Sequence, residues 1–215
     1  MQVVGPALTN DNRMRPSALI LLISFVLLPA LSACTRPATD ATGPEPYKPA
    51  GQGCIEGGRF NVAAYGAINA RIDWQGPSLQ CEGMARPLGE GARLRFAGFL
   101  EHSGENQVRN RHALAVILSI PGLAAGRTAD ALATRVTLIE EDSSRFFSTR
   151  ETSVCWSDIQ QQRPILNKSA TAIAERYIIS GLTYCVAPVA ELYGTASVTL
   201  SDMTFNGQIN WKADN

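Results

Sequence analysis

The 215-residue sequence has little of what most catalytic centres need. It holds two histidines, His102 and His112, and three lysines, Lys48, Lys168 and Lys212. The motifs of nucleophile-elbow hydrolases, P-loop NTPases, HExxH metalloproteases and dinucleotide-binding folds do not occur in it. We therefore expect a protein without a cofactor, and the sequence singles out no catalytic residues.

An excess of charge of either sign is also missing. The chain has 19 lysines and arginines against 19 aspartates and glutamates. Nucleic-acid-binding domains normally carry a basic surface, so we do not expect nucleic acid as a partner. The sequence has one long apolar run, at residues 18–31, and no second run that could cross a bilayer. The rest of the chain is therefore expected to be soluble.

The apolar run at residues 18–31 lies close behind a positive charge, Arg15. It is about 14 residues long, which is too short to span the roughly 30 Å of a bilayer's hydrocarbon core comfortably. A positive charge, a short apolar segment and small residues before a cleavage point are typical of a secretory signal.

The residues that end this run are Leu31, Ser32, Ala33 and Cys34. They resemble the lipobox of bacterial lipoproteins, in which signal peptidase II cleaves before the cysteine. The resemblance implies that Leu31, Ser32 and Ala33 are recognised and that Cys34 is acylated, for example with palmitate. Each buried methylene of an acyl chain adds about 0.8 kcal/mol of membrane affinity. The alternative is an ordinary signal peptide, or a transmembrane helix, that happens to contain a cysteine.

This interpretation divides the chain into three parts. Residues 1–33 are expected to be a lipoprotein signal peptide. One account of residues 1–13 is a start assigned too early, with Met14 the true start. Residues 34–53 hold the lipidated cysteine and a flexible tether rich in proline, threonine, alanine and glycine. Residues 54–215 are expected to form a single β-rich domain.

The residue after Cys34 is Thr35. In enterobacterial lipoproteins an aspartate at this place resembles an inner-membrane retention signal, so threonine favours the outer membrane, facing the periplasm. By this resemblance the lipid at Cys34 joins the protein to a membrane of the cell envelope. Its partner there would be an envelope protein or a glycan.

Four cysteines remain once Cys34 is assigned to the anchor. An even number in an exported chain predicts two disulfides, and four cysteines allow three pairings. We favour Cys54–Cys81 and Cys155–Cys185, because each pair lies in its own half of the chain. There is no C-x-x-C motif and no histidine within four residues of a cysteine, which disfavours a metal or redox site.

Hydrophobic alternation with a period of two dominates from Phe60 onward, and it is clearest over Arg93–Phe99. We expect an all-β domain, a disulfide-linked β-sandwich or barrel-like fold of about eight to ten strands. Residues 65–74 predict one of these strands. Residues 123–133 are interpreted as a loop or a short helix, and a short helix is also an option at residues 170–174.

The last strand changes the parity of its apolar residues at Ser201-Asp202. A β-bulge there would return both apolar sets to the same face of the sheet. The alternative is two strands joined by a turn. The residues concerned are Val198 and Leu200 before the change, and Met203, Phe205, Ile209 and Trp211 after it.

Residues 99–116 predict a hairpin whose polar tip, 102–111, lies between the two histidines. With a nearby glutamate, Glu101 or Glu105, the imidazoles of His102 and His112 would suit a zinc or copper ion. The alternative is two solvated histidines, because nothing constrains their spacing.

Two arginines, Arg109 and Arg111, lie at the same tip. Guanidinium groups bind phosphates and carboxylates well, so this loop could capture an anion. Alternatively, the charges keep a strand edge from pairing with neighbours. Three carboxylates at Glu140, Glu141 and Asp142 suggest either a calcium site or solvated turn residues.

The tryptophans are the remaining candidates for ligand contact. Aromatic rings can form platforms for sugars, but they are also common in cores. The three are Trp74, Trp156 and Trp211.

Three functional hypotheses follow. The first is a non-catalytic binding or accessory module anchored in the envelope. The second is an envelope glycan hydrolase that uses dispersed carboxylates. Metal or anion binding through residues 102–112 is a third.

Overall fold

The computed structural model describes residues 53–55, 57–87, 90–101, 111–150, 154–165 and 175–212. In this part of the chain the structure is all-β, as the sequence predicted, with thirteen strands and one three-residue 3-10 turn, η1 (Gly76–Ser78). The strands are β1 (Arg59–Gly66), β2 (Ala70–Gln75), β3 (Gln80–Ala85), β4 (Ala92–Glu101), β5 (Arg111–Ile120), β6 (Ala129–Ala133), β7 (Arg135–Glu140), β8 (Arg145–Ser148), β9 (Cys155–Pro164), β10 (Arg176–Cys185), β11 (Val189–Glu191), β12 (Ser197–Leu200) and β13 (Met203–Asn210).

Two details of the prediction were wrong. Thirteen strands exceed the expected eight to ten, in part because residues 65–74 are shared between β1 and β2, and because β11 and β12 are only three and four residues long. Residues 129–133 form the strand β6 instead of a loop or short helix, and the helix option at 170–174 lies outside the described residues. No helix in the described residues is long and apolar enough to span a membrane.

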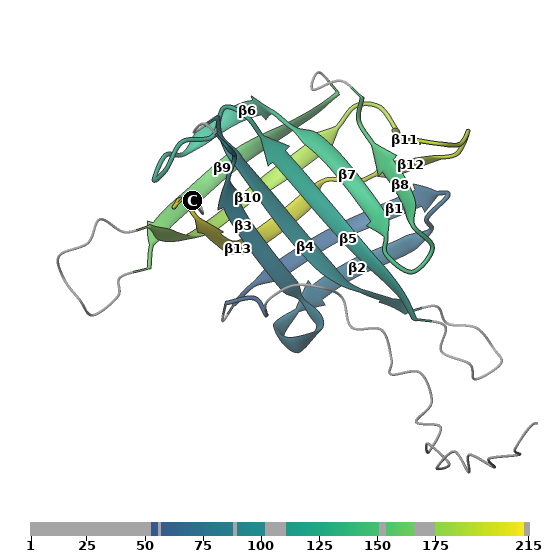
Figure 1. Cartoon of the computed structure of the whole chain (residues 1–215), viewed down its shortest axis with the longest axis horizontal. Coiled ribbons are helices and arrows are strands. Elements are labelled where there is room, and N and C mark those ends of the chain that lie inside the picture. The colour runs from purple at the N-terminus through teal and green to yellow at the C-terminus, as the bar shows by residue number, and fades with distance from the viewer. Residues whose placement is uncertain are drawn as a thin grey trace, which may run out of the picture. The chain divides into compact units, whose positions relative to one another are not determined.

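The strands form one sheet in the order β2-β1-β12-β11-β8-β7-β5-β4-β3-β13-β10-β9-β6, with a further pairing of β1 with β13. The sheet folds over itself into two layers. In Figure 1 the strands β3, β4, β5 and β7 lie in front and cross the direction of β9, β10, β13, β1 and β2 behind them. Because β1 contacts both β12 and β13, and β13 also bridges to β3, the layers are connected through hydrogen-bonded strands.

Side chains alternate in direction along each strand, and the inward-facing apolar ones fill the space between the layers. On β4, Leu94 and Phe96 are buried while Arg93 is exposed, as the pattern predicted. The ring of Phe96 stacks on that of Phe60 with centroids 4.8 Å apart and lies 5.6 Å from that of Phe205. These three rings therefore connect the front layer with the strands behind it.

The parity change at Ser201-Asp202 is a one-residue insertion between two separate strands, β12 and β13, so it combines the two alternatives that the sequence left open. Along β1, Asn61 and Ala64 are three residues apart, while their partners Thr204 and Leu200 are four apart. The extra residue bends the chain between β12 and β13 and keeps both apolar sets buried.

The expected strand over residues 65–74 is instead a hairpin. The chain turns at 67–69, between β1 and β2, and Ile68 in that turn is buried. The alternation of residues 65–74 is compatible with a continuous strand, so nothing in their period marked this turn. Gly66, with φ of 104°, provides a backbone conformation that other residues rarely adopt.

Both predicted disulfides are present. Cys54 pairs with Cys81, 27 residues later, and Cys155 pairs with Cys185, 30 residues later. Cys155 and Cys185 lie directly opposite each other on β9 and β10. The bond from Cys54 to Cys81 fastens the start of the described chain to β3.

Candidate functional site

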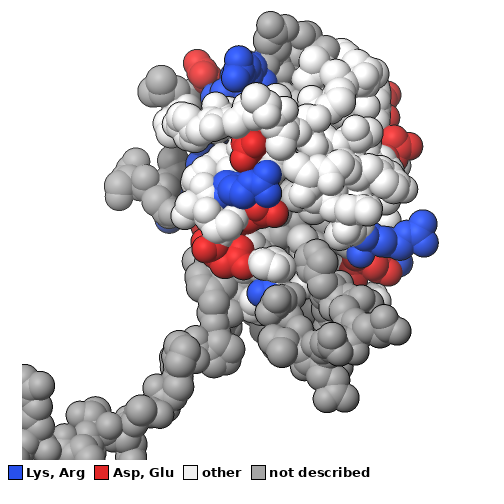
Figure 2. Space-filling model, turned by 90° about the vertical axis from the view of Figure 1, so that its right-hand side faces the viewer, with Lys and Arg blue, Asp and Glu red and all other residues white. Residues whose placement is uncertain are grey.

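Four chain reversals meet at one end of the domain. A groove of about 300 Å³ there is lined by the 67–69 turn, by Leu100 and His112 from the β4–β5 hairpin, and by residues of the β7–β8 turn. The β11–β12 hairpin joins them through the backbone hydrogen bond from Ala67 to Ser197, 3.0 Å long. Figure 2, which views the side of Figure 1 carrying β8, β11 and β12, shows acidic and basic side chains close together.

Strand alternation explains why charged groups are found here. Glu140, Arg145 and Glu191 have the same orientation as the core residues of their strands, but they lie where the strands end. Each is two residues from a fully buried side chain: Leu138, Phe147 and Val189, respectively. The charged groups therefore cover the end of the hydrophobic core, on the inner side of the sheet.

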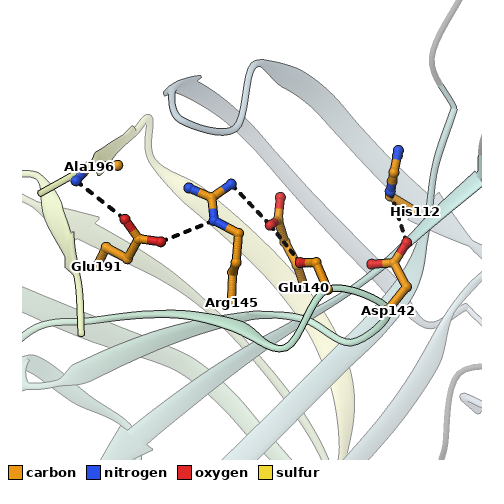
Figure 3. A network of polar contacts seen from close by, with 7 residues as sticks. His112, Glu140, Asp142, Arg145, Glu191 and Ala196 are labelled. Carbon is orange, nitrogen blue, oxygen red and sulfur yellow. Dashed lines mark hydrogen bonds and ion pairs between the residues drawn. The ribbon is translucent and has the colours of Figure 1, made fainter. Parts of the chain in front are cut away.

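Arg145 is the centre of the charged cluster (Figure 3). Its Nε donates to Glu191 Oε1 at 3.0 Å, and its Nη1 donates to Glu140 Oε2 at 3.2 Å. Ser143 donates to the same Oε2 of Glu140, and the Ala196 amide donates to the other carboxylate oxygen of Glu191, Oε2. The cluster is thus a set of oriented charges that connects β7, β8 and the β11–β12 hairpin.

The environment of Arg145 favours its charged form. The hydrogen bond with Glu191 is the main cause that raises the pKa of Arg145 above its ordinary value, and the negative charge of Glu140 adds to it. Burial acts in the opposite direction. The guanidinium also lies over the Phe147 ring, 5.0 Å from its centroid, so the cation contacts the end of the core directly.

Replacing Arg145 with methionine should destabilise the domain by about 1–2 kcal/mol at pH 7, because Glu140 and Glu191 would lose their cation while remaining mostly covered. Urea unfolding at pH 7 measures this. Arg135→Met, on an exposed position of β7, is the control and should change stability by less than about 0.5 kcal/mol. Equal losses in Arg145→Met and Arg135→Met would contradict the charge argument.

The three consecutive carboxylates do not converge on one point. Glu140 binds Arg145, Glu141 forms an ion pair with Arg95, and Asp142 Oδ2 lies 2.8 Å from His112 Nδ1. A calcium ion needs several oxygens directed at the same centre. Among the described residues there is no group of three or more histidine, cysteine, aspartate or glutamate side chains that could hold a metal ion.

The structure places only part of the predicted 102–112 site. His102, Glu105 and Arg109 lie outside the described residues, as does the side chain of Glu101. His112 belongs to the groove and contacts Asp142, a pairing that the sequence analysis did not anticipate. The metal hypothesis for His102 and His112 therefore stays a prediction.

A second, larger groove adjoins the first and shares Asn69 and Leu100 with it. It has a volume of about 650 Å³ and runs along consecutive residues of β2. Phe99, at the end of β4, and Arg111, at the start of β5, form its other wall. The guanidinium of Arg111 lies over the Phe99 ring at 5.6 Å.

The three tryptophans contribute to packing and do not form a shared surface for a sugar ligand. Trp74 is almost fully buried, and its indole N–H donates to the Phe99 carbonyl at 3.0 Å. Trp211 donates to Gln162 at 3.1 Å. Trp156 is half-buried and stacks on Tyr184, with centroids 6.0 Å apart. The three lie on separate strands or strand ends with different partners.

Sequence reasoning missed Arg145 and Glu191. The available signal was their parity, because each continues the inward-facing series of its strand beyond the last apolar residue. Which strand ends meet depends on the sheet order, and that order was not predictable from one sequence. Comparison of the chain with protein-family models, with curated proteins and with solved structures finds no match in any of the three.

Proposed function

We propose that the protein is a lipid-anchored, non-catalytic binding module of the bacterial cell envelope. The support for the location is the resemblance of residues 31–34 to a lipobox, together with two disulfides, which persist in oxidising compartments outside the cytosol. With the anchor at Cys34, the module acts close to a membrane surface, most simply the periplasmic face of the outer membrane. An envelope protein or glycan would be its partner.

The observation that carries the binding role is the pair of adjoining grooves at one end of the domain. Concave sites with a few oriented polar groups are typical of ligand binding. The carboxylates Glu140 and Asp142 direct their side chains at Arg145 and His112, which are protein groups. This arrangement gives no specific support to the glycan hydrolase alternative, which needs a pair of carboxylates directed at a substrate.

The anchor is tested by Cys34→Ser. Expressed in a Gram-negative host, the wild-type chain should be recovered with membranes, and its mature N-terminal peptide should begin at an acylated Cys34. The serine variant should lose the acyl mass and leave the membrane fraction, since serine has no thiol for the thioether. Mass spectrometry of the N-terminal peptide and fractionation measure both.

Thr35→Asp is the matched control. It keeps the acylated cysteine, and in an enterobacterial host the lipoprotein resemblance predicts that it moves the protein to the inner membrane. A wild-type protein that is processed at another residue, or that is recovered unacylated, would contradict the proposal.

A further inference from the structure

The larger groove contains an unpaired strand edge. β2 is the first strand of the sheet order and pairs only with β1 among the described residues. It is regular over its six residues, Ala70–Gln75, and contains no proline and no lysine. Exposed edges of this kind readily accept another strand, so proteins usually protect them.

The direction of the backbone groups of β2 follows from its neighbour. Ala63 of β1 uses its N–H and its carbonyl on the Ser201 side, in two hydrogen bonds of 2.8 Å each. Ala63 lies opposite Arg71, so this pair exchanges no hydrogen bonds and the N–H and C=O of Arg71 point away from β1. With the two-residue period of a strand, those of Asp73 point the same way.

A second observation supports this direction. The N–H of Gln75, two residues further on, donates to the Ser78 hydroxyl at 3.2 Å instead of to β1. The backbone groups of Arg71 and Asp73 make no hydrogen bond with any described residue outside the ladder. Two donors and two acceptors, spaced as in a strand, therefore face the groove.

The strand at the other end of the sheet order, β6, has a protected edge, whereas β2 does not. The register of β6 shifts between Ala129 and Leu132, and Ala131 has φ of 51°. The Ala131 N–H is occupied by the Asp158 carboxylate at 2.7 Å. A bulged, internally bonded edge cannot continue a ladder. Of the two terminal strands, β2 alone is suited to adding a strand.

The charges along the groove indicate the kind of strand. Asp73 is held by Arg59 through two hydrogen bonds of 3.1 Å, so its charge is balanced. Arg71 is exposed and has no ion-pair partner among the described residues. Arg111 lies on the facing wall, with its guanidinium over the apolar ring of Phe99.

We propose that β2 binds an extended acidic peptide by strand addition, with its backbone hydrogen-bonded to Arg71 and Asp73 and its carboxylates directed at Arg71. Apolar side chains of the peptide, on its alternate positions, lie against Phe99 and Leu100. This is the mode in which main-chain bonds provide affinity and flanking pockets provide selectivity. The inference deepens the proposed binding function and rests on it.

The test uses the full chain purified from membranes in detergent and a fluorescent peptide of alternating valine and aspartate. Fluorescence anisotropy should show saturable binding. Replacing aspartate by lysine in the peptide should abolish binding. Methylating every second backbone nitrogen on its hydrogen-bonding edge should weaken binding by about tenfold, because N-methylation removes the donors and leaves the charges.

The protein variants separate charge from backbone. Arg71→Gln should weaken binding of the acidic peptide by about tenfold through loss of the charged hydrogen bond. Arg71→Pro should weaken it by about a further fivefold, because proline also removes the edge N–H while an edge position tolerates it. Arg135→Gln, on exposed β7, should leave binding unchanged. Far-ultraviolet circular dichroism checks the fold, and the N-methylated peptide tests the same donors without any variant.

Three outcomes would overturn the inference. Equal affinity for the methylated and unmethylated peptides would mean attraction by charge alone. Binding of an N-acetylhexosamine oligomer in place of the peptide would make the groove a glycan site. A dimer seen by light scattering that dissociates in Arg71→Pro would mean that a second copy occupies the edge. Acylation and fractionation of the same preparation report on the envelope function independently, so failure of one proposal is distinguishable from failure of the other.

Discussion

Phe96→Ala should lower the free energy of unfolding by about 3–5 kcal/mol, the range for deleting a fully buried aromatic ring. Phe96 is 1% exposed and stacks on Phe60, while its ring lies against Gly207 of the other layer. A β-carbon built at Gly207 would come within 2.9 Å of the Phe96 ring, so the two positions are complementary. Urea unfolding followed by tryptophan fluorescence measures the loss.

Phe99→Ala is the matched control, because it removes the same side chain from the opposite face of the same strand. Phe99 is only half-buried, and its loss should destabilise by about 1 kcal/mol. Equal losses in the two variants would mean that the stacked rings are not the centre of the core.

Removing the disulfide between Cys155 and Cys185 by a double alanine variant should destabilise the domain by roughly 3–4 kcal/mol in the chain-entropy model. The bond closes a loop of 30 residues in the unfolded chain. The two strands it joins are already paired in the native ladder, so its main effect is expected on the unfolded state. Urea unfolding without reductant measures the change.

The corresponding variant of Cys54 and Cys81 provides the comparison. Its loop of 27 residues gives nearly the same entropy term, so the two double variants should lose similar stability if loop closure dominates. A clear difference between the two losses of stability would mean that native packing contributes, because Cys81 on β3 is buried while Cys54 is half-exposed. A double variant that unfolds at the wild-type urea concentration would contradict the prediction for its disulfide.

Local patterns predicted the elements with strong alternation. The β4 strand, the β4–β5 hairpin and the insertion at Ser201-Asp202 follow from a period of two, which one sequence displays directly. The cysteine pairing followed from an even count and from the separation of the pairs along the chain. The strand inferences need information from only a few neighbouring residues, and the cysteine pairing needs only the positions of the cysteines.

Features that depend on sheet order were not predictable. His112 meets Asp142, and Arg145 meets Glu191, across 30 and 46 residues of sequence. The turn at 67–69 interrupts a segment whose alternation fits a continuous strand, and tertiary packing of Ile68 decides the conformation there. The groove beside β2 likewise exists only because the ends of β4 and β5 lie opposite that strand.

The disulfide from Cys54 to Cys81 also has a mechanical consequence. Any tension applied through residues before Cys54 passes directly across the sulfur bridge into β3, where Cys81 is buried. The segment between the two cysteines, residues 55–80, which contains β1 and β2, is bypassed and carries none of the load. Without the bridge, extending that segment would release roughly 90–100 Å of chain. Under the proposed anchoring at Cys34, the covalent loop would shield the β2 edge from forces transmitted through residues 34–53.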